Sequence, residues 1–224
     1  MKPTVLTKAR LAEAAAQLAA KDSDLALILE RYGPPPMWQR QPGFATLIHI
    51  ILEQQVSLAA AASMFARLKQ HIDPLDPERV LQLGEPQLRS LGLTRQKTAY
   101  CLHLAETVAT NRLKLGSLSR LDDETVRTAL MEVKGIGTWS AEVYLLMVLR
   151  RPDIWPASDL ALATAAHEVK RLKQRPTPER LIQLAESWRP YRSVAARMLW
   201  QFYLAQRGKL EGQPILKSSK VRKS

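Results

Sequence analysis

The sequence predicts an all-α protein, and three observations support this prediction. Apolar residues recur at helical spacing, as in Phe44, Leu47, Ile48, Ile51 and Leu52, which follow the pattern of one buried helix face. Nearly every segment has a helix start or stop signal. No segment shows the sustained two-residue alternation of a half-buried strand, so we expect little or no sheet.

The expected helices follow from these signals in chain order. Asp76 and Glu85 open two short helices with proline in the first turn, and the second of these ends near Gly92. Thr94 caps a long helix, and Asp122 opens another with acidic residues at its start. The helices that Thr94 and Asp122 open are expected at 94–110 and 122–132. The remaining helices are expected at 8–20, 22–30, 44–52, 57–71, 138–150, 158–172, 177–188 and 191–207.

The chain carries a strong positive charge. Its 224 residues include 33 Lys and Arg against 21 Asp and Glu, which gives a formal charge of +12 and a pI near 10.1. This charge favours a polyanionic partner, either nucleic acid or an acidic membrane surface. The longest uncharged apolar stretches, 44–52 and 143–149, are far shorter than a span of about 20 residues, and no signal-peptide core follows Lys2. Nucleic acid is therefore the expected partner, and no membrane is expected.

Cysteine usage limits the cofactors. Cys101 is the single cysteine, which excludes an intrachain disulfide, a four-cysteine zinc site and a four-cysteine iron–sulfur cluster. The histidines show no metal-ligand spacing. We expect no required cofactor and a reducing compartment, either the bacterial cytosol and nucleoid or, in a eukaryote, the nucleus.

Two expected helices are joined by the short sequence Val-Lys-Gly-Ile-Gly-Thr. Gly135 and Gly137 permit a tight turn and remove the Cβ atoms that would hold a ligand away. The next helix begins at Thr138, so its free N–H groups and positive dipole end face the turn, where a phosphate can bind. We expect Ile136 to anchor the turn between the helices and Lys134 to lie beside the phosphate. For this motif alone, an ordinary helix–helix turn with a glycine cap is the alternative.

Four stretches of the sequence resemble the helix-hairpin-helix DNA glycosylase superfamily. Residues 130–141 resemble its hairpin, and residues 155–160 resemble the proline-containing loop that carries its catalytic aspartate. Residues 51–57 resemble its strand-separating turn, and residues 188–193 resemble the start of its final helix. The resemblance runs through 44–204 and is greatest to the 3-methyladenine DNA glycosylase II branch, here expected without that branch's N-terminal β domain.

The resemblance implies a two-lobed fold with the active cleft between the lobes. Residues 45–158 would form one lobe, which contains the helix-hairpin-helix unit at 122–150. Residues 1–44 would pack with residues 159–208 in the other lobe, and residues 209–224 would form a basic tail.

The resemblance also implies which residue performs the chemistry. Superfamily members that cut the DNA strand have a lysine in the second helix of the hairpin, where this sequence has Trp139, which cannot act as an amine nucleophile. Asp159 matches the catalytic aspartate, whose carboxylate would stabilise oxocarbenium-like charge on the sugar and orient or deprotonate the attacking water. Without the resemblance, Asp159 would be interpreted as a helix N-cap; with it, we expect Ser158 to cap the helix.

Further site residues come from the matched positions. Gln55, with Gln54 beside it, occupies the position of the wedge that fills the gap left by an extruded base; a solvated turn is the alternative. Trp139 and Tyr191 match residues of the base pocket, where an aromatic ring attracts a cationic base, and Trp38 is expected nearby. The core is expected to hold Trp155, Trp188, Trp200 and Phe202. Main-chain carbonyls that would bind a structural Na⁺ or K⁺ belong to Met131, Val133 and Ile136.

These features together predict a monofunctional DNA glycosylase without AP-lyase activity, which hydrolyses the N-glycosidic bond of alkylated purines such as 3-methyladenine in base excision repair. Its partner would be double-stranded DNA containing alkylated bases, bound by a monomer. One alternative keeps the enzyme and changes the substrate to uracil, mismatched or deaminated bases. The other is a non-catalytic helix-hairpin-helix DNA-binding protein.

Overall fold

A computed structural model shows that residues 3–208, the part of the chain that the structure describes, contain helices and no strand. The all-α prediction is therefore confirmed. The basic tail expected at 209–224 lies outside the described residues. The α-helices in chain order are α1 (Lys8–Lys21), α2 (Ser23–Tyr32), α3 (Phe44–Glu53), α4 (Leu58–His71), α5 (Pro77–Ser90), α6 (Arg95–Ala109), α7 (Asp123–Met131), α8 (Thr138–Val143), α9 (Leu160–Val169), α10 (Pro178–Ala185) and α11 (Arg192–Gln206). Shorter helical segments are η1 (Leu115–Arg120), η2 (Tyr144–Val148) and η3 (Glu186–Trp188).

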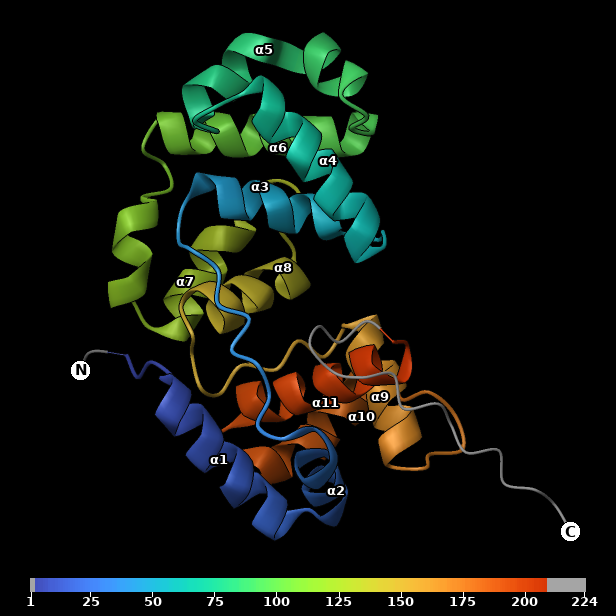
Figure 1. Cartoon of the computed structure of the whole chain (residues 1–224). Coiled ribbons are helices and arrows are strands. Elements are labelled where there is room, and N and C mark those ends of the chain that lie inside the picture. The colour runs from blue at the N-terminus through green and yellow to red at the C-terminus, as the bar shows by residue number, and fades with distance from the viewer. Residues whose placement is uncertain (1–2, 209–224) are drawn as a thin grey trace, which may run out of the picture.

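The helices form two groups (Figure 1). Helices α3 to α8 pack together in one group, and α1, α2 and α9 to α11 form the other. The first group is continuous in sequence, whereas the second joins the two ends of the described chain. The chain passes between the groups twice, through residues 33–43 and again through residues 149–159. Any side chain near these two crossings can therefore contact both groups.

Most helices begin where a side-chain cap predicts. Each capping side chain accepts a hydrogen bond from a backbone N–H of the first turn, which satisfies a donor that the helix itself cannot pair. The caps at positions used in the sequence prediction are Asp22, Ser57, Asp76, Thr94, Asp122 and Thr177. The two short helices expected between Asp76 and Gly92 are present as the halves of α5, which meet at Gly84 with a non-helical φ of 66°.

The long helix expected at 138–150 is only partly α-helical. After Val143 it widens into the π-helical η2, where the Leu149 N–H donates to the Tyr144 carbonyl over 3.1 Å. Donors from elsewhere in the chain bind two later carbonyls of η2: Arg197 donates to Leu146, and the Arg40 N–H donates to Met147. These tertiary donors replace local hydrogen bonds, and nothing in the local sequence pattern predicts them. The helix expected at 158–172 likewise ends early, at Val169.

The buried Arg197 on α11 joins the two groups of helices. Its guanidinium donates to the carbonyls of Met37 over 3.0 Å, of Ser193 over 3.1 Å and of Leu146 over 2.8 Å. Burial lowers the pKa of Arg197 to about 10, which still leaves it charged at neutral pH. The Met37 carbonyl lies in the first chain crossing and the Leu146 carbonyl in η2, just before the second crossing, so one side chain ties both segments to the final helix.

Candidate active site

The hairpin turn between α7 and α8 uses its two glycines for different purposes. Gly135 has φ +93°, and a Cβ at this position would lie 2.1 Å from the ring of Tyr100. A Cβ at Gly137 would meet nothing within 4 Å. Both glycines were expected to let a ligand approach, but the missing side chain of Gly135 makes room for Tyr100. Ile136 is buried between them, in the anchoring position that was predicted.

The turn presents unpaired backbone donors. Among the described residues, the N–H groups of Gly135, Gly137 and Thr138 have no hydrogen-bond acceptor, and Gly137 caps α8 without a side chain. By contrast, the Lys134 N–H donates to His103 Nδ1 over 3.1 Å, so this N–H is not available to an anion. The Lys134 side chain is exposed and is the group of this residue that can interact with one. Free donors at a helix start bind anions, so this turn fits a phosphate oxygen.

The carbonyls predicted to hold a cation lie at the same hairpin. Met131 ends α7, and the Val133 carbonyl accepts the Ile136 N–H over 2.9 Å, which leaves a second lone pair on that oxygen. In residues 3–208 no group of three or more His, Cys, Asp or Glu could hold a metal ion. A cation at the hairpin would thus rely on neutral main-chain oxygens, which suit a weakly bound alkali ion.

The carboxylate of Asp159 accepts three N–H groups from the described residues. Its Oδ1 accepts the Leu162 backbone N–H over 2.8 Å and the Trp200 indole N–H over 3.1 Å. Its Oδ2 accepts the Trp139 indole N–H over 2.8 Å. Two bonds fill both lone pairs of Oδ1, whereas one lone pair of Oδ2 stays free. Oδ2 is therefore the oxygen that can interact with a reacting group.

Asp159 combines two roles that the sequence analysis separated. It caps α9 through the bond to the Leu162 N–H, so the expectation that Ser158 would do the capping is wrong. The cap needs only Oδ1, and a carboxylate has a second oxygen for chemistry. Capping thus supplies part of the hydrogen bonding that orients the functional group.

Trp200 is a site residue that the sequence analysis assigned only to the core. It is indeed buried, but its indole N–H points to Asp159 from α11. The three elements that meet at this carboxylate are α8, the start of α9 and α11, so the site lies where the two groups of helices join. Helical spacing predicts that Trp200 is buried but not which polar group its N–H reaches.

The other two predicted pocket aromatics are half-buried beside this junction. Tyr191 is the N-cap residue of α11, and its N–H donates to the Trp188 carbonyl over 2.8 Å. Trp38 has a left-handed φ of 44° and follows Met37, whose carbonyl Arg197 holds. Contact of Tyr191 and Trp38 with a base stays a prediction.

The two wedge candidates differ in freedom. Gln55 is exposed and has φ +57°, so its side chain can extend away from the surface of the protein. Gln54 is half-buried, and its side-chain amide donates to the Gly135 carbonyl over 2.8 Å and to Ser140 Oγ over 2.9 Å. This structure corrects the assignment of Gln54 as a wedge, because its side chain is engaged with the hairpin. Gln55 remains the candidate.

One acidic group on α8 is partly neutralised by its surroundings. Burial raises the pKa of Glu142 to about 7, and this effect outweighs the opposite influence of Arg127 and Arg192. A substantial share of Glu142 is therefore uncharged at neutral pH. The helix that offers its N-terminus to phosphate thus carries less negative charge than its sequence suggests.

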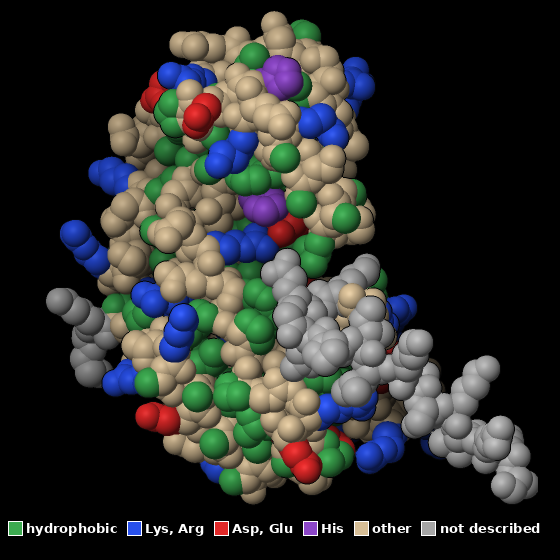
Figure 2. Space-filling model, viewed as in Figure 1, with side chains coloured by type: hydrophobic (Ala, Val, Ile, Leu, Met, Phe, Trp, Pro, Cys, Tyr) green, Lys and Arg blue, Asp and Glu red, His purple; other side chains and the backbone are tan. Residues whose placement is uncertain are grey.

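Positive side chains are distributed over both groups of helices. On the face that Figure 2 shows, Lys and Arg side chains lie over the upper and the lower group and outnumber acidic ones. This distribution fits the net charge of +12 and a long polyanion that contacts both groups. No helix among the described residues is long and apolar enough to span a bilayer.

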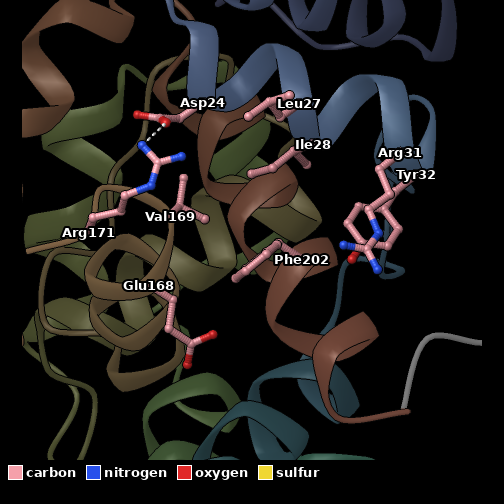
Figure 3. A pocket seen from close by; sticks show the side chains of 9 residues that line it. All are labelled: Asp24, Leu27, Ile28, Arg31, Tyr32, Glu168, Val169, Arg171 and Phe202. Atoms are coloured by element: carbon pink, nitrogen blue, oxygen red, sulfur yellow. Dashed lines mark ion pairs between the residues drawn. The ribbon is translucent and has the colours of Figure 1, made fainter. Parts of the chain in front are cut away.

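A separate pocket of about 210 Å³ lies away from Asp159 (Figure 3). Its lining includes Glu168 and Val169 at the end of α9, whereas Asp159 caps the start of that helix. An ion pair of 3.6 Å between Asp24 and Arg171 lies at its edge. The length of α9 separates this pocket from the carboxylate, so it is not the predicted base pocket.

Comparison with known proteins identifies the family. Residues 48–190 match the family model described as HhH-GPD superfamily base excision DNA repair protein. The chain belongs to this superfamily. The match includes the wedge turn, the hairpin and Asp159, and it ends just before Tyr191.

Several relatives of this superfamily member are similar over most of its length. DNA-3-methyladenine glycosylase 1 of Schizosaccharomyces pombe is 27% identical, with 88% of each chain covered. DNA-3-methyladenine glycosylase 2 of Escherichia coli is 27% identical over 77% of this chain. YfjP of Bacillus subtilis is 25% identical over 80% of this chain. The chain spans only 63% of the E. coli protein and 65% of YfjP, in each case less than two thirds.

Solved structures share the fold. The S. pombe 3-methyladenine DNA glycosylase Mag1, in complex with abasic DNA, matches with a TM-score of 0.79 and 26% identity over 84% of this chain and 95% of Mag1. A DNA-3-methyladenine glycosidase from Bacillus halodurans matches with a TM-score of 0.73 and 28% identity over 88% and 91% of the two chains. The predicted helix-hairpin-helix glycosylase fold is thereby confirmed.

Replacement of Gly135 by alanine should destabilise the protein. The left-handed φ costs a non-glycine residue roughly 1–2 kcal/mol, and the overlap with Tyr100 adds to this, so we expect a loss of more than about 2 kcal/mol in the free energy of unfolding. Gly116→Ala is the matched control, because a Cβ there meets open space at an ordinary φ. Urea unfolding of both variants measures the difference. Equal stabilities would show that Tyr100 does not require Gly135.

Proposed function

We propose that this superfamily member is a monofunctional DNA glycosylase that hydrolyses the N-glycosidic bond of alkylated purines in base excision repair. The observation that carries the proposal is the Asp159 carboxylate, held by three neutral N–H donors beside a phosphate-binding hairpin. The names of the S. pombe and E. coli relatives support 3-methyladenine as the substrate class.

Asp159 would act on the sugar. Cleavage of the glycosidic bond develops positive charge at the anomeric carbon, and a nearby carboxylate stabilises that charge. The free lone pair of Oδ2 is available to this cation or to the attacking water, while Oδ1 is saturated by Leu162 and Trp200. An alkylated purine leaves as a neutral base because it is already cationic, so no strong general acid is needed.

Aromatic side chains would select the base. Trp139 lies beside the carboxylate, and Tyr191 and Trp38 are half-buried near the same junction. The face of an aromatic ring attracts a cationic base with roughly 0.5–2 kcal/mol, whereas a neutral normal base gains no such attraction.

The partner would be double-stranded DNA that contains alkylated bases, bound by one copy of the chain. The free N–H groups of the hairpin would bind one phosphate, and Na⁺ or K⁺ on the Met131, Val133 and Ile136 carbonyls would add positive charge there. Na⁺ and K⁺ are redox-inert, so the cation would be structural.

Removal of the Asp159 charge should abolish base release. Asp159→Asn keeps the shape and one oxygen for the cap, but it places an NH₂ group against one of the indole N–H donors and removes the negative charge. We expect base release from 3-methyladenine duplexes to fall by at least about 100-fold, with DNA affinity largely retained. The measurement is single-turnover release of the base, alongside binding to an abasic-site analogue.

The same assay separates the alternatives. Duplexes that carry 3-methyladenine, 1,N6-ethenoadenine, hypoxanthine or uracil are compared with the wild-type protein. Release of uracil or hypoxanthine without release of 3-methyladenine would replace the proposed substrate class. Binding without any release would favour the non-catalytic DNA-binding alternative, and full activity of Asp159→Asn would refute the catalytic assignment.

Trp200→Phe should slow base release without unfolding the protein. The substitution keeps an aromatic ring but removes the N–H that fills Oδ1, which frees the carboxylate to turn. We expect a rate about tenfold lower, as for the loss of one hydrogen bond to a charged group. Trp155→Phe is the control, because the buried Trp155 N–H has no partner among the described residues. If both variants react at the same rate, Trp200 is only a core residue.

The protein should form no covalent adduct with DNA. A strand-cutting glycosylase forms a Schiff base through a lysine at the position of Trp139. The buried Lys97 is committed to the Leu52 carbonyl over 2.6 Å, and Lys134 lies in the phosphate turn. Incubation with lesion DNA and borohydride should therefore trap no protein–DNA species on a denaturing gel. A trapped band would establish lyase chemistry.

A further inference from the structure

The turn between α3 and α4, residues 54–57, is anchored at its first residue, Gln54, and at the two preceding residues of α3. Lys97 on α6 donates to the carbonyl of Leu52, just before the turn, over 2.6 Å. Arg40 forms two hydrogen bonds of 2.8 Å with the carboxylate of Glu53, which is buried. Gln54 follows with its own contacts. Each anchor comes from a different part of the chain, so the path of the backbone into the turn is fixed.

Gln54 connects this turn to the hairpin. Its amide nitrogen carries two hydrogens, and both have acceptors: the Gly135 carbonyl at 2.8 Å and Ser140 Oγ at 2.9 Å. Gly135 belongs to the turn with unpaired N–H donors, and the buried Ser140 is adjacent to Trp139. The side-chain amide of Gln54 therefore contacts both the hairpin turn and α8. Helix α8 also carries Trp139, which donates to the Asp159 carboxylate.

Gln55 comes directly after this anchor and is free at its side chain. Its φ of +57° is a left-handed conformation that costs a non-glycine residue roughly 1–2 kcal/mol. Such a conformation persists only where the surroundings impose it. The bonds of Gln54 supply that constraint on one side, and the side chain of Gln55 has no hydrogen bond to any described residue.

We infer that Gln54 is a positioning residue that couples the phosphate-binding hairpin to the wedge, so that the grip on the DNA backbone holds Gln55 in place during base extrusion. This inference deepens the proposed function and rests on it. Gln54 itself touches neither the base nor the sugar; it acts through Gln55.

The coupling should affect one step only. Extrusion of a base costs a few kcal/mol. A wedge residue offsets this cost only if its backbone stays in place while its side chain fills the gap in the base stack. Loss of Gln54 should therefore slow release from a paired lesion and spare release from a lesion that is already unpaired. A general structural defect would slow both reactions.

The test compares Gln54→Ala with the wild-type protein on two DNA substrates. Each carries one 7-methylguanine, either paired with cytosine or placed in a single-nucleotide bulge with the same flanking duplex. We expect the variant to react about tenfold more slowly on the paired lesion, equivalent to about 1.4 kcal/mol, and within about twofold of wild type on the bulge. Equal loss on both substrates, or no loss on either, would overturn the inference.

A double-mutant cycle tests whether Gln54 acts through Gln55. If it does, Gln54→Ala combined with Gln55→Ala should release the paired base no more slowly than Gln55→Ala alone. Additive losses would contradict the coupling. Gln82→Ala on α5 is the matched control, since the side chain of this exposed glutamine has no hydrogen bond to another described residue. Ser140→Ala removes one acceptor only and serves if Gln54→Ala unfolds; it should slow the paired reaction with the same selectivity.

A readout without cleavage separates this inference from the proposed function. A 2-aminopurine next to the lesion brightens when the stack opens. If wild-type protein brightens the paired duplex and Gln54→Ala does not, the coupling holds even where no base is released. If base release occurs and both proteins brighten the duplex equally, the coupling fails while the proposed function stands.

Discussion

The site depends on a buried negative charge that is held without being neutralised. Asp159 is largely buried, and it forms no ion pair with the Lys and Arg residues of 3–208. A backbone N–H and two indole N–H groups bind it instead, which offsets part of the cost of burial. Because these donors carry no net charge, the full negative charge remains available to a cation that forms nearby. A lysine in their place would cancel the field that the proposed reaction requires.

This requirement explains why the fold joins distant segments at one point. The donors come from α8, α9 and α11, and only the contact between the two groups of helices brings them together. The hairpin serves the same geometry from the other side. Its unpaired N–H donors and Trp139 belong to adjacent positions of one helix start, so a phosphate bound there would fix the DNA relative to the carboxylate.

Much of the architecture follows from local sequence. Caps such as Asp122 and Thr94 determine helix starts within a few residues, and the glycines and the following helix start identify the hairpin. The contacts that could not be predicted span long stretches of chain. Trp200 reaches Asp159 across 41 residues, and Gln54 reaches Gly135 across 81. Helical periodicity shows that such side chains face inward but carries no information about their polar partners. The π-helical η2 escaped prediction for the same reason, since remote donors stabilise it.

The buried guanidinium of Arg197 affects how the protein and the DNA of the proposed complex would adapt to each other. Bending the protein at its chain crossings would strip carbonyl partners from a buried cation, which is costly in a dry interior. A hinge at that point is therefore stiff. If a duplex binds as proposed, the helices would keep their arrangement and the nucleic acid would undergo the distortion. A duplex that contains a damaged or poorly stacked base deforms at lower cost, so the mechanical compliance of the DNA would contribute to how the proposed enzyme distinguishes a lesion from intact DNA.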